Sequence, residues 1–142
     1  MRIELAEQED DIARCYPVMV QLRPHLDAPT FVAQVQRQFD QGYRLAFVED
    51  NGTVVAVAGF REMEMLSRGR HIYVDDLETD AAGRSKGYGA ALMDWLVAYA
   101  RERGLDAVEL DSGVQRFDAH RFYFRQRMHV ASYHFTLSKD KW

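Results

Sequence analysis

The sequence predicts an α/β (α+β) fold in which a mixed, mostly antiparallel central sheet is flanked by helices. At 142 residues the chain is long enough for one hydrophobic core and short for two, so we expect a single domain over residues 1–142. Two strand patterns joined by the tripeptide DNG at 50–52 predict a β-hairpin, and hence an antiparallel pair. A strand, helix and strand between His71 and Leu110 predict a parallel pair with a right-handed crossover.

The N-terminal part carries one short strand pattern and two helical patterns. Arg2–Leu5 alternates polar and apolar residues, which predicts an edge strand. A helix is expected from residue 10 or 11 to about residue 22, and Pro24 ends it. A second helical pattern opens at Pro29 and has apolar residues three and four apart; it stops before Gly42, where a left-handed conformation is expected.

The middle of the chain is rich in strand patterns. Residues 43–49 and 53–61 are rich in β-branched and aromatic residues and form the predicted hairpin. His71–Thr79 is a further predicted strand, although it places Asp75, Asp76 and Glu78 where a buried strand is normally apolar. These acidic residues are therefore candidates for a functional site.

The last part alternates between helices and strands. A helix is predicted from Gly87 to Arg103, with Gly104 as its stop. A strand over 106–110, a short helix over 118–125 and a final strand over 128–137 follow. The predicted order is therefore β-α-α-β-β-β-α-β-α-β.

Composition and charge restrict the classes of function. The 18 basic and 22 acidic residues give a net charge of −4, which argues against general nucleic-acid binding. No apolar run reaches the roughly 18 residues of a membrane span, and the N-terminus has no signal-peptide core, so we expect a cytoplasmic protein without membrane contact. The single cysteine, Cys15, excludes an internal disulfide and a cysteine zinc cage, and we expect it to pack on a helix face.

The segment Arg84–Leu92, RSKGYGAAL, combines cations and glycines at the start of the most regular helix. The first N–H groups of a helix are unpaired and carry partial positive charge, so they can hold an anion. Gly87 and Gly89 remove Cβ atoms that would block an approaching anion, while Arg84 and Lys86 add full charges. These features are typical of a phosphate-binding loop.

Other interpretations of this segment remain open at this point. The glycines also suit a plain turn between a strand and a helix, with the cations simply solvated. A Rossmann fingerprint fits less well, because the third glycine is missing and the loop is long. A Walker loop is excluded, since no Gly-Lys-Ser/Thr is present.

The hexapeptide RSKGYG at 84–89 resembles the Gln/Arg-x-x-Gly-x-Gly/Ala motif of the GCN5-related N-acetyltransferases (GNAT family). VDDLET resembles the splayed fourth strand of that family, DAVELDS its fifth strand, and AHRFYFRQRM its Ala-x-x-Phe-Tyr-x-x-x-Gly-Phe segment. The resemblance extends over about residues 51–128 in the family's order and spacing. Two positions depart from it, because Arg127 stands where a glycine is expected and Arg116 where an asparagine is frequent.

The resemblance implies acetyl-coenzyme A as donor cosubstrate. The loop and helix N-terminus would hold its pyrophosphate, and backbone groups of the fourth strand would pair with the pantetheine arm. The cofactor-binding residues implied in this way are Leu77, Glu78, Thr79, Arg84, Ser85, Lys86, Gly87, Tyr88, Gly89 and Ala90. Beyond residue 128 the chain offers one strand's length instead of the family's two, so this edge is either built differently or completed by a partner.

Acetyl transfer to an amine requires an uncharged nitrogen and a proton for the departing thiolate. Asp75 and Asp76 are the leading candidates for the base, since carboxylates in an apolar strand are costly unless they face a cleft. Tyr73 and Glu109 are less favoured alternatives. An equally open alternative is that one aspartate merely pairs with an arginine or caps a loop.

Tyr123 is the candidate general acid, because the resemblance implies a phenol near the cofactor sulfur at this position. The competing interpretation is that its ring packs with Phe122 and Phe124 on a short helix. The five histidines are too irregularly spaced to predict a metal site.

We therefore expect an acyltransferase, an acetyl-CoA-dependent N-acetyltransferase that moves the acetyl group directly to a primary amine of a small molecule or a protein. The alternative function is an inactive acetyl-CoA-binding sensor or partner module. The expected partner is the amine substrate, with no nucleic acid, and a homodimer is possible. Residues 10–41 and 62–70, which would shape the acceptor site, carry no readable substrate code.

Overall fold

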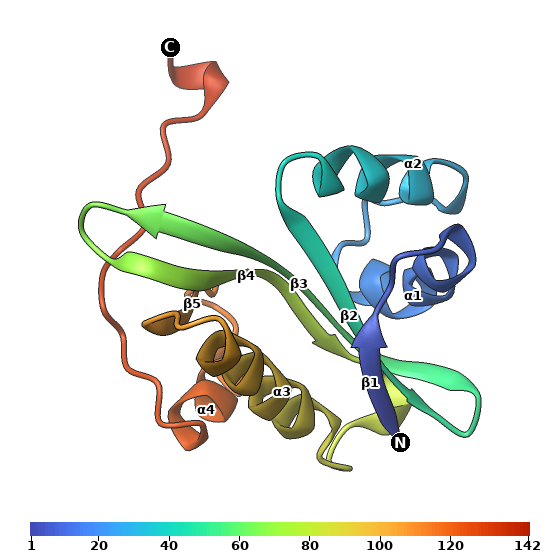
Figure 1. The fold of residues 1–142 in the computed structure, drawn as a ribbon. Coiled ribbons are helices and arrows are strands. Elements are labelled where there is room, and N and C mark those ends of the chain that lie inside the picture. Colours follow the sequence, from blue (N-terminus) through green and yellow to red (C-terminus); the bar gives the residue numbers. More distant parts are fainter. The chain divides into compact units, whose positions relative to one another are not determined.

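The computed structural model describes all 142 residues, which divide into two compact units, Met1–Leu110 and Asp111–Trp142. The first unit holds a five-stranded sheet with three helices (Figure 1). Its elements are β1 (Arg2–Leu5), α1 (Glu9–Leu22), α2 (Ala28–Phe39), β2 (Tyr43–Asp50), β3 (Thr53–Met65), β4 (Gly69–Thr79), the 3₁₀ turn η1 (Ala81–Gly83), α3 (Tyr88–Glu102) and β5 (Ala107–Leu110).

The strands lie side by side in the order β1-β2-β3-β4-β5. Neighbours from β1 to β4 are antiparallel, whereas β4 and β5 are parallel. The hairpin turn between β2 and β3 has Asn51 at φ 52° and Gly52 at φ 77°, the positive values that a two-residue type I′ turn requires. The predicted mixed, mostly antiparallel sheet is confirmed.

Helices cover both faces of this sheet (Figure 1). On one face, α1 and α2 pack on β2 and β3 through a core that includes Ile12, Phe31 and Phe47. On the other face, α3 buries Leu92 and Leu96. Cys15 belongs to the first core, where burial raises the pKa of its thiol to about 12, so the packing role predicted for it is confirmed. No helix is long and apolar enough to cross a bilayer.

The second unit contains α4 (Phe117–Arg125) and a terminal 3₁₀ turn η2 (Lys139–Lys141). Residues 128–138 form neither helix nor strand, so the final strand predicted over 128–137 is wrong. The alternation of apolar residues there suits a strand, but a strand exists only when a neighbour completes its hydrogen bonds, and this unit contains no other strand. The apolar side chains of the segment are exposed by 70% at Val130 and 91% at Phe135.

Candidate active site

Strand β4 carries a bulge at the position of the predicted acidic residues. Gly59 of β3 pairs with Asp76, and Phe60 pairs with Val74, so Asp75 is one extra residue in β4. Strand β5 pairs with β4 only over His71–Val74 and ends at Leu110. From Asp75 to Thr79, β4 therefore has a strand neighbour on the β3 side alone. Strands β4 and β5 thus diverge after Val74, as expected for the splayed fourth strand of the family.

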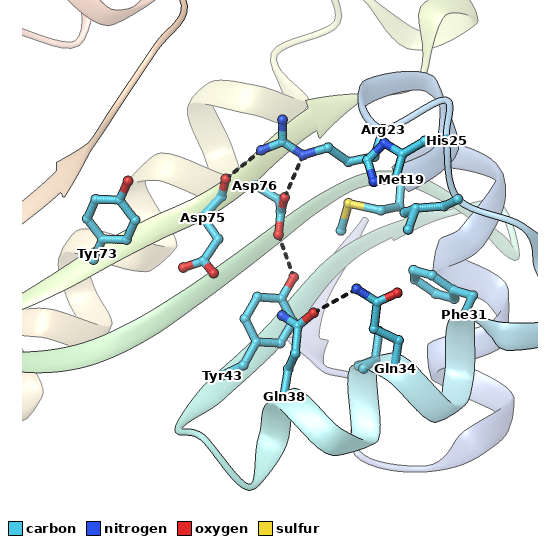
Figure 2. Close-up of a pocket in the computed structure, with 12 residues that line it drawn as sticks. Met19, Arg23, His25, Phe31, Gln34, Gln38, Tyr43, Tyr73, Asp75 and Asp76 are labelled. Carbon is cyan, nitrogen blue, oxygen red and sulfur yellow. Dashed lines mark hydrogen bonds and ion pairs between the residues drawn. The ribbon is translucent and has the colours of Figure 1, made fainter. Parts of the chain in front are cut away.

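Each aspartate at the bulge binds an arginine. Arg61 on β3 donates to both carboxylate oxygens of Asp75, at 2.9 and 3.1 Å. Arg23, at the C-terminal end of α1, donates from Nε to Asp76 Oδ1 at 3.0 Å and from Nη2 to the backbone oxygen of Asp75 at 2.9 Å (Figure 2). Both aspartates therefore pair with an arginine, the contact that the alternative interpretation expected for one of them.

Tyr43, the first residue of β2, completes this network. Its hydroxyl donates to Asp76 Oδ2 at 2.8 Å (Figure 2). The guanidinium of Arg61 lies over its ring at 5.4 Å. Burial and the neighbouring Asp76 carboxylate raise the pKa of the Tyr43 phenol well above its usual value, so the hydroxyl keeps its proton. The side chains of Asp75 and Asp76 remain 20% and 15% exposed, because they also face a cavity.

This cavity has a volume of about 370 Å³ and lies between β4 and the first two helices. Its wall combines aspartate, arginine, glutamine and tyrosine side chains with apolar ones (Figure 2). The lining residues are Met19, Arg23, His25, Leu26, Phe31, Gln34, Val35, Gln38, Tyr43, Tyr73, Asp75 and Asp76. The size and the mixed lining suit a small polar molecule.

Asp75 is the carboxylate in this wall whose proton affinity is perturbed upwards. Desolvation raises its pKa above the usual aspartate value, although the bond from Arg61 acts in the opposite direction. A carboxylate with a raised pKa in a cavity is the kind of group that can accept a proton from a bound ammonium. Of the two less favoured alternatives, Tyr73 lines the same cavity, whereas Glu109 does not.

The predicted phosphate loop leads into α3 through an unusual N-cap. Gly87 is the N-cap in the left-handed region at φ 84°, and no side chain caps the helix. The first helical bond is Ala91 N–H to Gly87 O at 3.0 Å, so the amides of residues 88–90 precede the hydrogen-bond ladder. A Cβ placed on Gly87 would meet no atom within 4 Å, so the space beside these amides is open. This environment fits an anionic group.

Side chains hold this loop in place from within the first unit. Arg84 pairs with the buried Glu78 of β4 at 3.1 Å. The buried ring of Tyr88 lies against Gly83, and its hydroxyl donates to Asp50 at 2.5 Å. Tyr88 and Glu78 therefore turn their side chains into the protein, and what they can offer a ligand is backbone.

Tyr123 lies on α4, in the second unit. Its ring contacts that of Phe122 edge to face, with centroids 5.6 Å apart. At the end of this helix Arg127 adopts φ 65°, a left-handed conformation that normally favours glycine. The backbone there thus keeps the shape for which the resemblance leads one to expect glycine, although the residue differs.

Three residues of the site were not predicted from the sequence: Arg23, Tyr43 and Arg61. Arg23 lies 53 residues before Asp76, and Tyr43 lies 33 residues before it, so no local pattern connects them. One signal was present, since Gly59 stands inside a strand of β-branched and aromatic residues, where glycine often marks a close approach by another group.

Comparison with known proteins identifies the class of protein to which this fold belongs, the acetyltransferases. The family model described as acetyltransferase (GNAT) family matches residues 5–128, so the chain belongs to this family. It is 38% identical over 116 residues to the uncharacterized N-acetyltransferase YhdJ of Bacillus subtilis, a match that covers 81% of this chain and 82% of that protein. The predicted assignment as an acyltransferase, an N-acetyltransferase of the GNAT type, is confirmed.

Two further proteins are similar to this chain, one in sequence and one in structure. The aminoalkylphosphonate N-acetyltransferase of Salmonella typhimurium is 32% identical over 95 residues, which is 66% of this chain and 60% of that protein. The crystal structure of the ribosomal-protein-alanine N-acetyltransferase from Brucella melitensis superposes with a TM-score of 0.81 at 19% identity, over 98% and 99% of the two chains. At this identity the second similarity shows the fold alone.

Proposed function

We propose that this chain transfers the acetyl group of acetyl-CoA directly to a primary amine of a small molecule bound in the cavity beside Asp75. The observation that carries the proposal is the position of the bulge. Asp75 and Asp76 face a 370 Å³ cavity at the point where β5 stops and the edge of β4 opens. One strand can thus present acidic groups to an acceptor and backbone groups to a donor.

The donor side consists of the loop and the open edge of β4. Acetyl-CoA, when bound, supplies an activated thioester. The amides of residues 88–90 and the charges of Arg84 and Lys86 would hold its pyrophosphate, while the backbone of residues 77–79 would pair with the pantetheine arm. The open space beside Gly87 supports this assignment.

On the acceptor side, we assign the base to Asp75. Its raised pKa and its place in the cavity wall favour proton transfer from the acceptor ammonium, directly or through water. The neutral nitrogen then bonds to the acetyl carbon as the carbon–sulfur bond breaks, and Tyr123 would protonate the departing thiolate. This role requires the second unit to work with the first, as one domain over residues 1–142.

A small acceptor agrees best with the dimensions of the cavity. The charged side chains of its lining include Arg23, Asp75 and Asp76, and Asp75 also pairs with Arg61. The two positive and two negative charges of these four residues cancel, so a polyamine would gain no net electrostatic attraction. An acceptor that carries both an amine and an acidic group suits such a balanced wall, and one relative is named for aminoalkylphosphonates. We therefore place this class first among the acceptors to test.

The test is a free-thiol assay with acetyl-CoA and a panel of aminoalkylphosphonates, amino acids, polyamines, aminoglycosides and peptides. We expect turnover with small amines and little with peptides. Asp75→Asn should lower the rate near neutral pH more than at high pH, where the acceptor is already neutral. Binding of acetyl-CoA without turnover of any acceptor would instead support the inactive sensor.

A further inference from the structure

Tyr43 reaches across a whole strand to contact the acceptor cavity. It begins β2 and pairs with Arg61 of β3, yet its hydroxyl bonds to Asp76 of β4. A Cβ built on Gly59 would lie 1.7 Å from the Tyr43 hydroxyl oxygen and 2.3 Å from Cζ. The phenol thus lies directly over Gly59, the β3 residue that pairs with Asp76. Any side chain at position 59 would block this path.

The Tyr43 phenol is a fixed donor. It is 2% exposed, and burial raises the pKa of the phenol well above its usual value, so the hydroxyl keeps its proton and donates to Asp76. Arg23 donates to the other oxygen of Asp76. Two donors from different elements therefore determine the orientation of the Asp76 carboxylate.

We propose that Tyr43 is a positioning residue that holds the Asp76 carboxylate oriented in the acceptor cavity, and that glycine at position 59 makes this contact possible. In this arrangement Asp76 binds and orients the acceptor ammonium, while Asp75 takes its proton. The contribution to acceptor binding rests on the proposed function. The effect of Tyr43 on the Asp76 carboxylate does not.

The first experiment compares Tyr43→Phe with the parent protein by carbon-13 NMR of the aspartate carboxyl groups at neutral pH. Phenylalanine keeps the ring over Gly59 and removes the donor, so the carboxyl chemical shift of Asp76 should change. Site-specific 3-fluorotyrosine at position 43 is a nearly isosteric and stronger donor, and it should move this chemical shift in the opposite direction. Tyr16→Phe is the control, because Tyr16 does not itself line the cavity and its hydroxyl donates to the Leu26 carbonyl instead of to an aspartate.

The second experiment measures steady-state kinetics with a confirmed acceptor. Tyr43→Phe should raise KM for the amine by roughly fivefold and leave KM for acetyl-CoA unchanged. Gly59→Ala should act in the same direction, since the added methyl displaces the phenol from Asp76. A purely structural role for Tyr43 would not separate the two substrates in this way.

The outcomes distinguish the two proposals. If the Asp76 carboxyl signal has the same chemical shift in the parent and in the Phe and fluorotyrosine variants, the positioning role is overturned, whatever the activity. If the parent acetylates no acceptor, the proposed function fails, and the NMR comparison still decides whether Tyr43 positions Asp76. An equal rise in KM for both substrates would also overturn the assignment to the acceptor cavity.

Discussion

At the scale of single residues, the two neighbouring aspartates of β4 have different surroundings. The bulge turns Asp75 and Asp76 to one cavity, whereas a regular strand would turn successive side chains to opposite faces. Asp75 has one arginine partner and a raised pKa, while Asp76 is fixed by donors on both oxygens. The same residue type is thus suited to proton transfer in one position and to orientation in the next.

The proposed role of Tyr123 can be tested by removing a single atom, its phenol oxygen. Tyr123→Phe keeps the ring and its contact with Phe122 but removes the hydroxyl, so fold and acetyl-CoA affinity should persist. Loss of a general acid should reduce kcat by a factor on the order of 10 to 10⁴. Steady-state kinetics with a confirmed acceptor measure this. Unchanged kcat would mean that the ring serves packing alone.

Glu49 predicts a pH dependence of stability. Hydrogen bonds from Arg2 and Arg14 lower its pKa to about 2, and these arginines come from β1 and α1. The ionised form is therefore favoured in the folded state, and this stabilisation is present above the unfolded pKa and is lost as pH falls through about 2.

Glu49→Gln should accordingly lower the melting temperature at pH 7, and the difference from the parent should shrink between about pH 4.5 and pH 2. Thermal unfolding followed by circular dichroism across this range measures the difference. Glu7→Gln, at an exposed position, is the control and should change little. A difference that is constant with pH would contradict the ion-pair explanation.

At the scale of elements, the two ends of α3 both depend on glycine in a left-handed conformation. Gly87 at the start has φ 84° and Gly104 after the end has φ 66°, and a Cβ at either position would meet no atom within 4 Å. Alanine at either site therefore costs backbone strain of about 1 kcal/mol without a steric clash. Because the expected cost in stability is the same at both positions, Gly104→Ala can serve as the control for Gly87→Ala.

Gly87→Ala should weaken acetyl-CoA binding, because the methyl group occupies the space beside the amides of residues 88–90. Gly104→Ala should cost similar stability and leave the affinity for acetyl-CoA unchanged. Calorimetric titration with acetyl-CoA and urea unfolding provide the two measurements. Equal affinity of both variants would show that the pyrophosphate does not bind at this loop.

Helix α4 ends in a Schellman motif built on an unfavourable residue. Met128 N–H bonds to Tyr123 O at 3.1 Å and Arg127 N–H to Phe124 O at 3.0 Å, while Arg127 itself has φ 65°. Arg127→Gly should therefore stabilise the protein by about 1 kcal/mol in urea unfolding. Gln126→Gly is the control at φ −80° and should destabilise it. A loss of stability in Arg127→Gly would show that the arginine side chain contributes more than its backbone costs.

At the scale of the whole molecule, the two units differ in how much of the backbone is regular. The sheet and helices of the first unit enclose buried cores on both faces, whereas residues 128–138 of the second unit have no regular structure and expose large apolar side chains. Backbone of this kind is the preferred substrate of proteases.

Brief digestion with chymotrypsin should cut after Tyr133 or Phe135, whose side chains are 81% and 91% exposed, before it cuts in β2 or β3. Mass spectrometry of the early fragments identifies these sites. Buried Phe47 and Phe60 serve as internal controls within the same chain. Protection of the C-terminal segment would show that a partner chain completes it as a strand.

The sequence by itself determined the features that depend on near neighbours in the chain. The DNG turn, the stops at Gly42 and Gly104 and the glycine loop before α3 follow from local backbone preferences, and the order of elements follows from hydrophobic periodicity. The resemblance to the family added the proposed role of Tyr123 as general acid. These features need only a few consecutive residues, and for this reason the sequence contained them.

Only the tertiary structure decided what surrounds the two aspartates and what becomes of the C-terminal segment. The contacts of Arg23 and Tyr43 with Asp76 span 53 and 33 residues. The first exists because the end of α1 lies beside β4, and the second because the sheet brings β2 and β4 to either side of Gly59. The predicted strand at 128–137 failed for the complementary reason. Alternating apolar residues permit a strand, but the hydrogen bonds that make one come from a neighbour that the local sequence does not specify.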